Sequence, residues 1–186
     1  MHILFALDSF KGTLSSKEAG DIVSKAFMKQ LDITHETYAL ADGGEGTLDT
    51  LVENNKGTVV NKRVGDPFGR PVEARYGLLK DNSAVIEMAE AAGLARLDEG
   101  EADPLRASSR GVGELICDAL DKGIRKFIVG IGGSATNDMG MGLLHALGYR
   151  FLNQRGQVMS PSGESMAHVT SIDRSGVHPA LEKAQF

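Results

Sequence analysis

The feature that most constrains the fold is a pattern repeated near the start of the chain: a short apolar run ends in a polar loop, which passes into an amphipathic helix. The first run, 3–7, precedes a helix that begins at Ser15, where Ser15 and Glu18 have the spacing of a capping box. The second run, 37–40, leads into another helical pattern after the loop 41–47. Strands and helices that alternate in this way favour a parallel, doubly wound sheet.

The pattern changes in the middle of the chain. Residues 58–64, 71–79 and 83–88 read as three strands joined by turn-rich segments, which predicts an antiparallel meander and a second α+β lobe. Helical spacing then returns, and a buried strand is expected at 126–131, ahead of a glycine-rich turn and a short helix. The polar, irregular stretch 153–176 is expected to be an exposed loop.

Composition excludes several classes of protein. Lys and Arg total 20 against 25 Asp and Glu, the net charge is −5, and Trp is absent, so nucleic acid is not an expected partner. The single cysteine, Cys117, rules out an internal disulfide and falls on the apolar face of a predicted helix. It indicates a reduced core residue and hence a cytoplasmic protein. No segment approaches membrane-spanning length, so no membrane partner is expected.

Three polar, glycine-containing loops follow expected strands, at 8–12, 42–47 and 132–138. Loops at the ends of strands in open α/β sheets are where ligands bind. Glycine lets backbone amides approach a ligand closely, and the neighbouring hydroxyl and amide groups can donate to an oxyanion. The three loops therefore predict chemistry on a phosphate group.

Transfer of a phosphoryl group needs positive charge at that group, and usually Mg²⁺ held by a carboxylate. Lys11 could supply the positive charge. The carboxylates that could hold the metal are those of Asp8, Asp42, Glu45 and Asp138. The pattern itself does not single out one of them.

Helix capping is the alternative explanation for parts of these loops. Asp42 and Glu45 have capping-box spacing ahead of a helix, so reciprocal capping and a functional role both remain open. Capping could also explain Ser134, Thr136 and Asn137. Three hydroxyl or amide groups after paired glycines exceed what one cap needs, so we favour a binding role for them.

Two other functions compete for the glycine-rich loop. Residues 130–135 match the G-x-G-x-x-A fingerprint of dinucleotide-binding proteins, so a nicotinamide-dependent oxidoreductase is the second hypothesis. That fingerprint expects an acidic residue after the next strand, where Asn153 follows the strand expected at 149–152. A Walker A loop is excluded because the chain has no Gly-Lys pair. A phosphate-ligand-binding module without catalysis is the third hypothesis.

The chain resembles the type-1 glycerate kinases along essentially its whole length. Six stretches carry the resemblance, in the family's order: 8–12 (DSFKG), 41–47 (ADGGEGT), 66–72 (DPFGRPV), 86–89 (IEMA), 111–116 (GVGELI) and 130–138 (GIGGSATND). Six stretches in order are far more specific than any one of them. The chain departs from the family at Met139, where glycine is common, and it looks like the N-terminal half of such an enzyme.

The resemblance implies an activity and a fold. The activity is transfer of the γ-phosphoryl group of ATP to D-glycerate, giving 2- or 3-phosphoglycerate, with ATP and Mg²⁺ as cofactors. The fold is a Rossmann-like or flavodoxin-like domain with a parallel sheet, which faces a second, smaller α/β lobe with antiparallel strands across a cleft. Residues 1–60 would form the first part of the Rossmann-like or flavodoxin-like domain, and residues 61–186 would form the second lobe, which contains the glycine-rich loop.

Residue roles follow from matching these motifs. Asp8, Ser9 and Lys11 are expected to contact substrate and phosphate, with Lys11 neutralising charge on the transferred group and Asp8 as one candidate for the general base. The metal is assigned to Asp42 and Asp138. The residues expected to bind substrate or phosphate are Ser9, Gly12, Gly43, Gly44, Glu45, Gly46, Gly132, Gly133, Ser134, Thr136 and Asn137.

Overall fold

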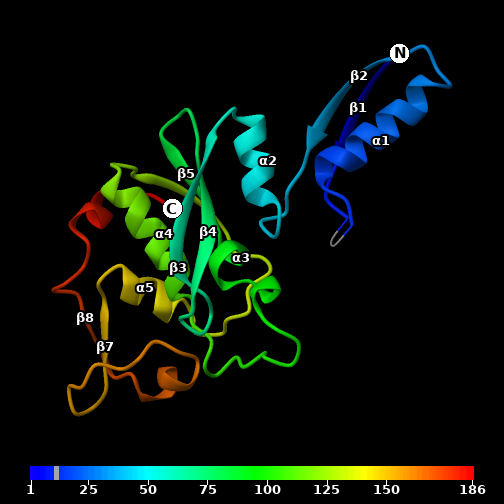
Figure 1. The fold of residues 1–186 in the computed structure, drawn as a ribbon. Helices are drawn as coiled ribbons and strands as arrows, with labels where there is room; N and C mark the ends of the chain where they lie inside the picture. The colour runs from blue at the N-terminus through cyan, green and yellow to red at the C-terminus, as the bar shows by residue number, and fades with distance from the viewer. Residues whose placement is uncertain (11–12) are drawn as a thin grey trace.

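The structure is a computed structural model, which describes residues 1–10 and 13–186 (Figure 1). Lys11 and Gly12, expected at the first polar loop, lie outside the described residues. The chain forms two units that follow one another in sequence. The first unit holds β1, α1 and β2 and lies to one side of the rest of the molecule.

The N-terminal unit has the βαβ arrangement that the sequence predicts. The strands β1 (His2–Leu7) and β2 (Thr34–Ala39) pair in parallel, and α1 (Ser16–Met28) connects them. The predicted capping box is confirmed, because Ser15 accepts from the backbone N–H of Glu18 and the Glu18 carboxylate accepts from that of Ser15. Phe5 packs edge-on against Phe27 of α1, with the ring centroids 5.5 Å apart.

The second unit is built on a four-stranded sheet with the order β3-β4-β5-β6. Its strands are β3 (Thr58–Gly65), β4 (Pro71–Leu78), β5 (Ser83–Glu87) and β6 (Lys126–Gly130). The first three run antiparallel, which confirms the predicted meander, and β6 pairs in parallel with β5. The fold is therefore α/β with a mixed sheet, and a crossover through α3 (Met88–Ala92), the 3₁₀ turn η1 (Leu94–Arg96) and α4 (Arg110–Asp121) joins its parallel strands.

Helices cover both faces of this sheet because neighbouring residues of a strand point to opposite sides. On β5, Ala84 and Ile86 belong to the main apolar cluster with Leu115 and Ile116 of α4. Val85 between them packs in a separate cluster under α2 (Thr47–Asn54). All five residues of β5 are buried, which is why its sequence lacks the alternation of a half-exposed strand.

The contacts of α2 bear on where the two parts of the chain divide. This helix packs on β4 and β5 more than on β2, and β3, which contains residue 60, pairs with β4 along its whole length. We therefore propose a boundary within 40–46, ahead of the one expected near residue 60. Figure 1 shows this segment as the single connection that leads from β2 to α2.

The C-terminal part adds short elements to the second unit. They are α5 (Met141–Ala146), β7 (Arg150–Leu152), η2 (Glu164–His168), β8 (Ser171–Asp173) and η3 (Pro179–Lys183). The stretch expected to be a loop at 153–176 contains β8, which pairs antiparallel with β7. A strand of three residues is too short to show an alternating pattern, and the rest of that stretch is largely irregular.

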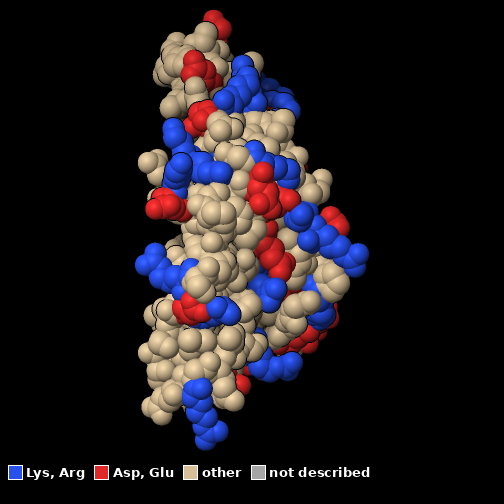
Figure 2. Space-filling view, turned by 90° about the vertical axis from the view of Figure 1, so that its left-hand side faces the viewer, with Lys and Arg blue, Asp and Glu red and all other residues tan. Residues whose placement is uncertain are grey.

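Cys117 lies on α4 as predicted and packs against the main apolar cluster. Its thiol donates to the carbonyl oxygen of Ala146 at 3.3 Å, and burial raises its pKa to about 11. These features are those of an unreactive core thiol. Within residues 1–10 and 13–186, no helix is both long and apolar enough to span a bilayer. On the face shown in Figure 2, basic and acidic side chains are interspersed.

Candidate active site

The two later polar loops, which follow β2 and β6, meet backbone to backbone. The amide of Gly132 donates to the carbonyl oxygen of Gly43 at 2.8 Å. A Cβ atom added to Gly132 would stand 2.6 Å from the Cα of Gly44, and one added to Gly130 would stand 2.7 Å from the Gly43 oxygen. Only glycine permits this approach, so the glycines here hold two loops together.

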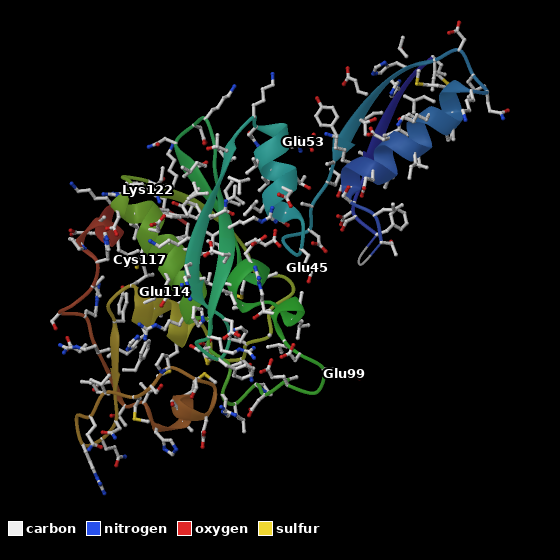
Figure 3. The ribbon with its side chains drawn as sticks, in the orientation of Figure 1. Glu45, Glu53, Glu99, Glu114, Cys117 and Lys122 are labelled. Carbon is white, nitrogen blue, oxygen red and sulfur yellow. The ribbon has the colours of Figure 1, made fainter. Side chains whose placement is uncertain are left out.

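Glu45 lies where these loops meet the first polar loop. In Figure 3 its side chain is labelled on the segment between the N-terminal unit and the four-stranded sheet. A cavity of about 290 Å³ lies beside it, lined by Ser9, Phe10, Thr13, Leu14, Ser15, Glu45 and Gly46. A Cβ atom added to Gly133 would lie 3.6 Å from the Cγ of Glu45. The structure thus brings the three predicted loops together around one carboxylate.

Residues 8–10 are the described part of the first loop, and Asp8 and Ser9 are its predicted site residues. The Asp8 carboxylate is exposed and accepts from the backbone N–H of Ser9 at 2.6 Å, while Ser9 lines the cavity at Glu45. An exposed carboxylate beside a cavity can accept a proton from a bound hydroxyl group. Their expected roles stay predictions.

A second cavity, of about 280 Å³, adjoins Glu45 and Gly46 on the side of the four-stranded sheet, and its other lining residues are Arg75, Glu87, Ala89, Glu90, Ala95 and Arg96. Arg75 binds Glu90 at 2.6 Å and Asp49 at 3.0 Å, and Arg96 approaches Glu90 at 3.6 Å. The hydrogen bond to Glu90 is the largest of the interactions that raise the pKa of Arg75. These two arginines are held in place by carboxylates, so the cavity has positive charge that is already compensated.

Glu87 is a residue that sequence reasoning did not assign to the site. It is 4% exposed at the end of β5, and its carboxylate accepts from the amides of Gly46 at 3.3 Å and Leu48 at 2.9 Å. Burial raises the pKa of Glu87. The signal was present as a carboxylate inside an otherwise apolar strand, in the stretch 86–89.

The contacts of Glu87 also settle how α2 begins. The N-cap residue of α2 is Gly46, which has a left-handed φ of 89°. As a glycine it has no side chain that could accept a hydrogen bond from the helix. The Asp42 carboxylate accepts instead from the amide of Gly44 at 2.8 Å. Reciprocal capping of α2 by Asp42 and Glu45 is therefore wrong, because a buried carboxylate from a distant strand takes the first amides of the helix.

Backbone hydrogen bonds join the loop after β6 to the connection between α3 and η1. The amide of Leu94 donates to the Gly133 carbonyl oxygen at 2.9 Å, and that of Ala135 donates to the Ala92 carbonyl oxygen at 2.8 Å. The hydroxyls of Ser134 and Thr136 lie 2.8 Å apart, and Ser134 accepts from the Thr136 amide. Neither hydroxyl caps α5, so the expected binding role of these residues remains a prediction.

Asp138 has a structural position that the sequence did not reveal. It is 2% exposed, and one carboxylate oxygen accepts from the backbone and hydroxyl of Ser109 and from the amide of Gly142, at 2.8 to 2.9 Å. The other oxygen accepts from the amide of Gly140 at 3.1 Å. Asp138 therefore caps α5 and fastens it to the start of α4.

Two further findings concern the metal and the departure from the family pattern. In the part of the chain that the structure describes, no group of three or more His, Cys, Asp and Glu side chains could hold a metal ion. Met139 is 88% exposed and has a φ of 51°, in the left-handed region that glycine adopts without strain. The backbone path there is thus the one that a glycine would favour.

The chain is similar to known proteins along essentially its whole length. The glycerate kinase of Bacillus subtilis (strain 168) is 41% identical over all of this chain and 49% of its own length. The glycerate 2-kinase of Escherichia coli K12 is 39% identical over 98% of this chain and 48% of its own length. A crystal structure described as that of "putative glycerate kinase 2" from Salmonella typhimurium LT2 has a TM-score of 0.86 and 42% identity, covering 100% of this chain and 51% of that one.

The chain thus spans about half the length of the curated relatives it matches. A family model described as the glycerate kinase family matches residues 3–186. The match covers both units and all three glycine-containing loops. The chain belongs to the glycerate kinase family.

Proposed function

We propose that this chain carries the substrate and phosphate loops of a glycerate kinase, which transfers the γ-phosphoryl group of ATP to D-glycerate and yields phosphoglycerate. The observation that carries the proposal is the meeting of three polar loops around Glu45. Membership of the family supports it, because relatives of similar sequence are named glycerate kinase. A dinucleotide-binding oxidoreductase is not favoured by these relatives.

The loops would act through their backbone. Residues 43–46 and 132–137 would direct amides and hydroxyls at oxyanions of the carboxylate or the phosphates, and Lys11 would neutralise charge that grows on the transferred group. Glu87 holds the amides of Gly46 and Leu48, so it fixes the end of one loop beside Glu45. Asp8 would accept the proton of the attacking glycerate hydroxyl.

The residues proposed for Mg²⁺ differ in how well they fit it. Carboxylate oxygens are the ligands that Mg²⁺ prefers, and when bound with ATP the ion neutralises phosphate charge. Asp138 fits poorly because both of its oxygens already accept hydrogen bonds in a buried site. Asp42 lies on the loop beside Glu45, and we propose it as the ligand from this chain.

The first test is a coupled assay of ADP release from MgATP and D-glycerate, with phosphoglycerate identified by mass spectrometry. The protein is assayed as the 186-residue chain and as a hybrid in which this chain replaces the matching part of the Bacillus subtilis relative. We expect turnover by the hybrid and negligible turnover by the chain alone, since alignment of the reacting oxygens needs both walls of a cleft. Tight binding of NAD(H) with no use of ATP would overturn the proposal.

A matched pair of variants tests the role of Lys11 in the hybrid. Lys11→Met should lower kcat by about 10²-fold or more, because it removes a cation from the developing charge. Lys80→Met, which changes an exposed lysine in the turn before β5, should leave kcat unchanged. Normal turnover by the folded Lys11→Met variant would show that Lys11 has no part in the site.

A further inference from the structure

Glu45 lies at the tip of a tight turn. The amide of Thr47 donates to the carbonyl oxygen of Gly44 at 3.2 Å, so residues 44–47 form a β-turn in which Glu45 is the second residue. The third residue, Gly46, has a φ of 89° and a ψ of −4°, which are the values of that position in a type II turn. Residues 43, 44 and 46 are glycine, so Glu45 carries the only side chain of this segment.

The buried carboxylate of Glu87 holds this turn against the four-stranded sheet. It accepts from the amide of Gly46, which belongs to the peptide bond that follows Glu45, and from the amide of Leu48. Separating these amides from Glu87 would leave a charged group buried without its hydrogen bonds, which is costly. The backbone that carries Glu45 is therefore fixed, whereas the Glu45 side chain is exposed.

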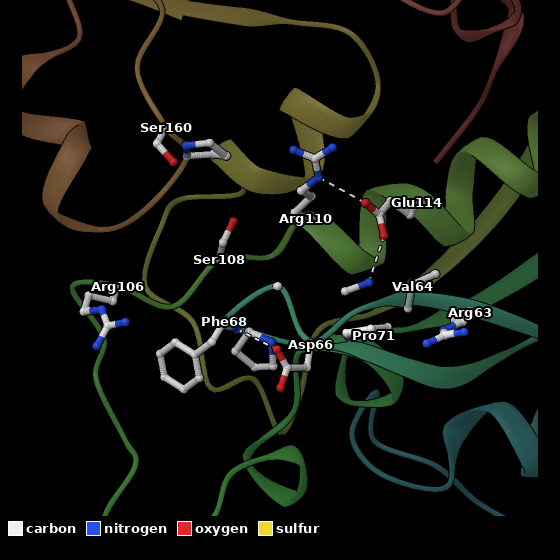
Figure 4. A pocket seen from close by; sticks show the side chains of 14 residues that line it. Arg63, Val64, Asp66, Phe68, Pro71, Arg106, Ser108, Arg110, Glu114 and Ser160 are labelled. Carbon is white, nitrogen blue, oxygen red and sulfur yellow. Dashed lines mark hydrogen bonds and ion pairs between the residues drawn. The ribbon is translucent and has the colours of Figure 1, made fainter.

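The Glu45 carboxylate differs from other carboxylates beside cavities because it has no donor. Within residues 1–10 and 13–186 it forms no ion pair and no hydrogen bond, although it lines both cavities at the meeting point of the loops. In one of these cavities Glu90 is bound by Arg75 at 2.6 Å. Figure 4 shows a larger cavity of the second unit, of about 630 Å³, in which Glu114 is bound by Arg110 at 3.0 Å.

The charge of Glu45 decides which part of a ligand it can bind. An exposed carboxylate is ionised near neutral pH, so it accepts hydrogen bonds and donates none. It repels the carboxylate and phosphate groups of a ligand, and it attracts hydroxyl groups. Its two oxygens can accept from two hydroxyls at once. The group that fits Glu45 is therefore a pair of neighbouring hydroxyls.

Backbone donors for the anionic end of such a ligand lie close to Glu45. A Cβ atom added to Gly133 would stand 3.8 Å from the Oε1 of Glu45. The amides of Gly133 and Ser134 donate to no oxygen of the residues that the structure describes. A three-carbon acid is about 5 Å long by ordinary bond lengths, so it can reach from these amides to the Glu45 carboxylate.

We propose that Glu45 is a specificity-determining residue that accepts hydrogen bonds from both hydroxyls of a 2,3-dihydroxy acid, and that Glu87 is the residue that positions it. This inference rests on the proposed function, in which D-glycerate accepts the phosphoryl group. A site built to bind a hydroxyl discriminates against an analogue that lacks it, because the partner in the site is left unpaired. The analogues to be rejected are D-lactate, which lacks the 3-hydroxyl, and 3-hydroxypropionate, which lacks the 2-hydroxyl.

The test is isothermal titration calorimetry of the hybrid with D-glycerate, D-lactate and 3-hydroxypropionate, without nucleotide. We expect the Kd of D-glycerate to be lower than that of either analogue by about tenfold or more, the value of a hydrogen bond to a charged group. Equal Kd values, or no binding of D-glycerate, would overturn the inference. Selective binding of D-glycerate without its phosphorylation in the separate kinase assay would overturn the proposed function alone.

A matched pair of variants connects the selectivity to Glu45. Glu45→Gln removes the charge and keeps the shape, so it should weaken the binding of D-glycerate by about tenfold and bring the three Kd values together. Glu99→Gln changes an exposed glutamate of the loop between η1 and α4, labelled in Figure 3, and should leave all three unchanged. Selectivity that survives in Glu45→Gln, or that is lost equally in Glu99→Gln, would overturn the inference.

The positioning role of Glu87 has its own readout. Glu87→Gln puts an NH₂ donor in place of one acceptor oxygen, so one of the two amides loses its partner and the selectivity for D-glycerate should fall. Because Glu87 acts through Glu45, the double variant should be no less selective than Glu45→Gln. A further loss in the double variant would show that Glu87 does not act through Glu45. Circular dichroism checks the fold, and the comparison of Glu45→Gln with Glu99→Gln decides the role of Glu45 even if Glu87→Gln does not fold.

Discussion

The N-terminal unit and the unit around the four-stranded sheet both combine strands with helices, but helices cover much less of the sheet in the N-terminal unit. In the first, a two-stranded parallel sheet has one helix against it, and Phe5 and Ala19 are its buried apolar residues among those described. Its helix leaves Ile22 55% and Met28 51% exposed. In the second, helices lie on both faces of the sheet and the main cluster contains 15 buried residues.

The comparison shows that a similar order of strands and helices does not give two units the same stability. Parallel strands are typically buried on both faces, and a pair of strands alone has too little apolar surface to be stable independently. In the second unit the apolar surface is buried, and Ile86, Leu115 and Ile116 are all fully buried. We therefore expect the two units to open at different free energies, the N-terminal one first.

The largest effect should come from the core of the second unit. Leu115→Ala removes a fully buried side chain from α4 and should lower the free energy of unfolding by about 3 kcal/mol. Ile22→Ala, the corresponding change on the exposed face of α1, should change it by at most about 0.5 kcal/mol. Urea unfolding followed by circular dichroism measures both. Equal losses would show that Ile22 is buried in solution and that the two units are covered alike.

The N-terminal unit could be predicted from the sequence because its signals are local. The capping box of Ser15 and Glu18 lies within four residues, and the helical spacing that follows it is regular. The meander was also predictable, since turns and alternating residues lie between consecutive strands. In both cases each element is specified by its own residues.

The candidate site was predictable only in part, because its contacts join distant segments. That three polar loops follow strand ends could be read from the sequence, and the structure brings them together at Glu45. That Glu87 caps α2, and that Asp138 fastens α5 to Ser109, could not be read, since the partners lie 39 and 29 residues apart. The spacing of Asp42 and Glu45 suggested a capping box at the start of α2. In the structure the buried carboxylate of Glu87, from β5, accepts hydrogen bonds from the first amides of this helix instead.

A smaller effect is expected where the two glycine-rich loops touch. Gly132→Ala would place a Cβ atom 2.6 Å from the Gly44 Cα, so the loops must separate, at a cost of about 2 kcal/mol. Gly65→Ala is the matched control, because its Cβ would meet its nearest neighbour at an ordinary 3.5 Å. Thermal unfolding measures the loss. If the two variants melt alike, the loops are not held together by this contact.

A carboxylate of the second unit that is paired with two lysines predicts a difference in pH dependence. Asp118 is bound by Lys62, Lys122 and the hydroxyl of Tyr76, and although burial opposes it, these hydrogen bonds lower the pKa of Asp118 to about 2. The pKa of Asp118 is therefore lower in the folded protein than in the unfolded chain, where it is near 4. Ionised Asp118 stabilises the folded protein fully above about pH 4, and this stabilisation is lost as the pH falls through about 2.

Asp118→Asn should therefore cost about 1 kcal/mol at neutral pH, a modest amount because both lysine side chains are nearly half exposed to solvent. The difference from the unmodified chain should shrink as pH falls from 4 to 2. Asp32→Asn, an exposed aspartate between α1 and β2, should show no such trend. A difference that stays constant with pH would show that the ion pairs do not form in solution. The measurement is urea unfolding at a series of pH values.

The cap at the start of α1 tests whether the N-terminal unit opens by itself. Ser15→Ala removes the oxygen that accepts from the Glu18 amide, and loss of an N-cap costs about 1 kcal/mol. Ser15→Asp keeps an acceptor and is the control. In hydrogen exchange, Ser15→Ala should reduce protection of the amides of α1 and β1 and leave those of α4 unchanged, because the capped helix belongs to a unit with its own opening equilibrium. If protection in α4 falls by the same factor, the two units unfold as one, and the contrast between them lies in their covering rather than in their stability.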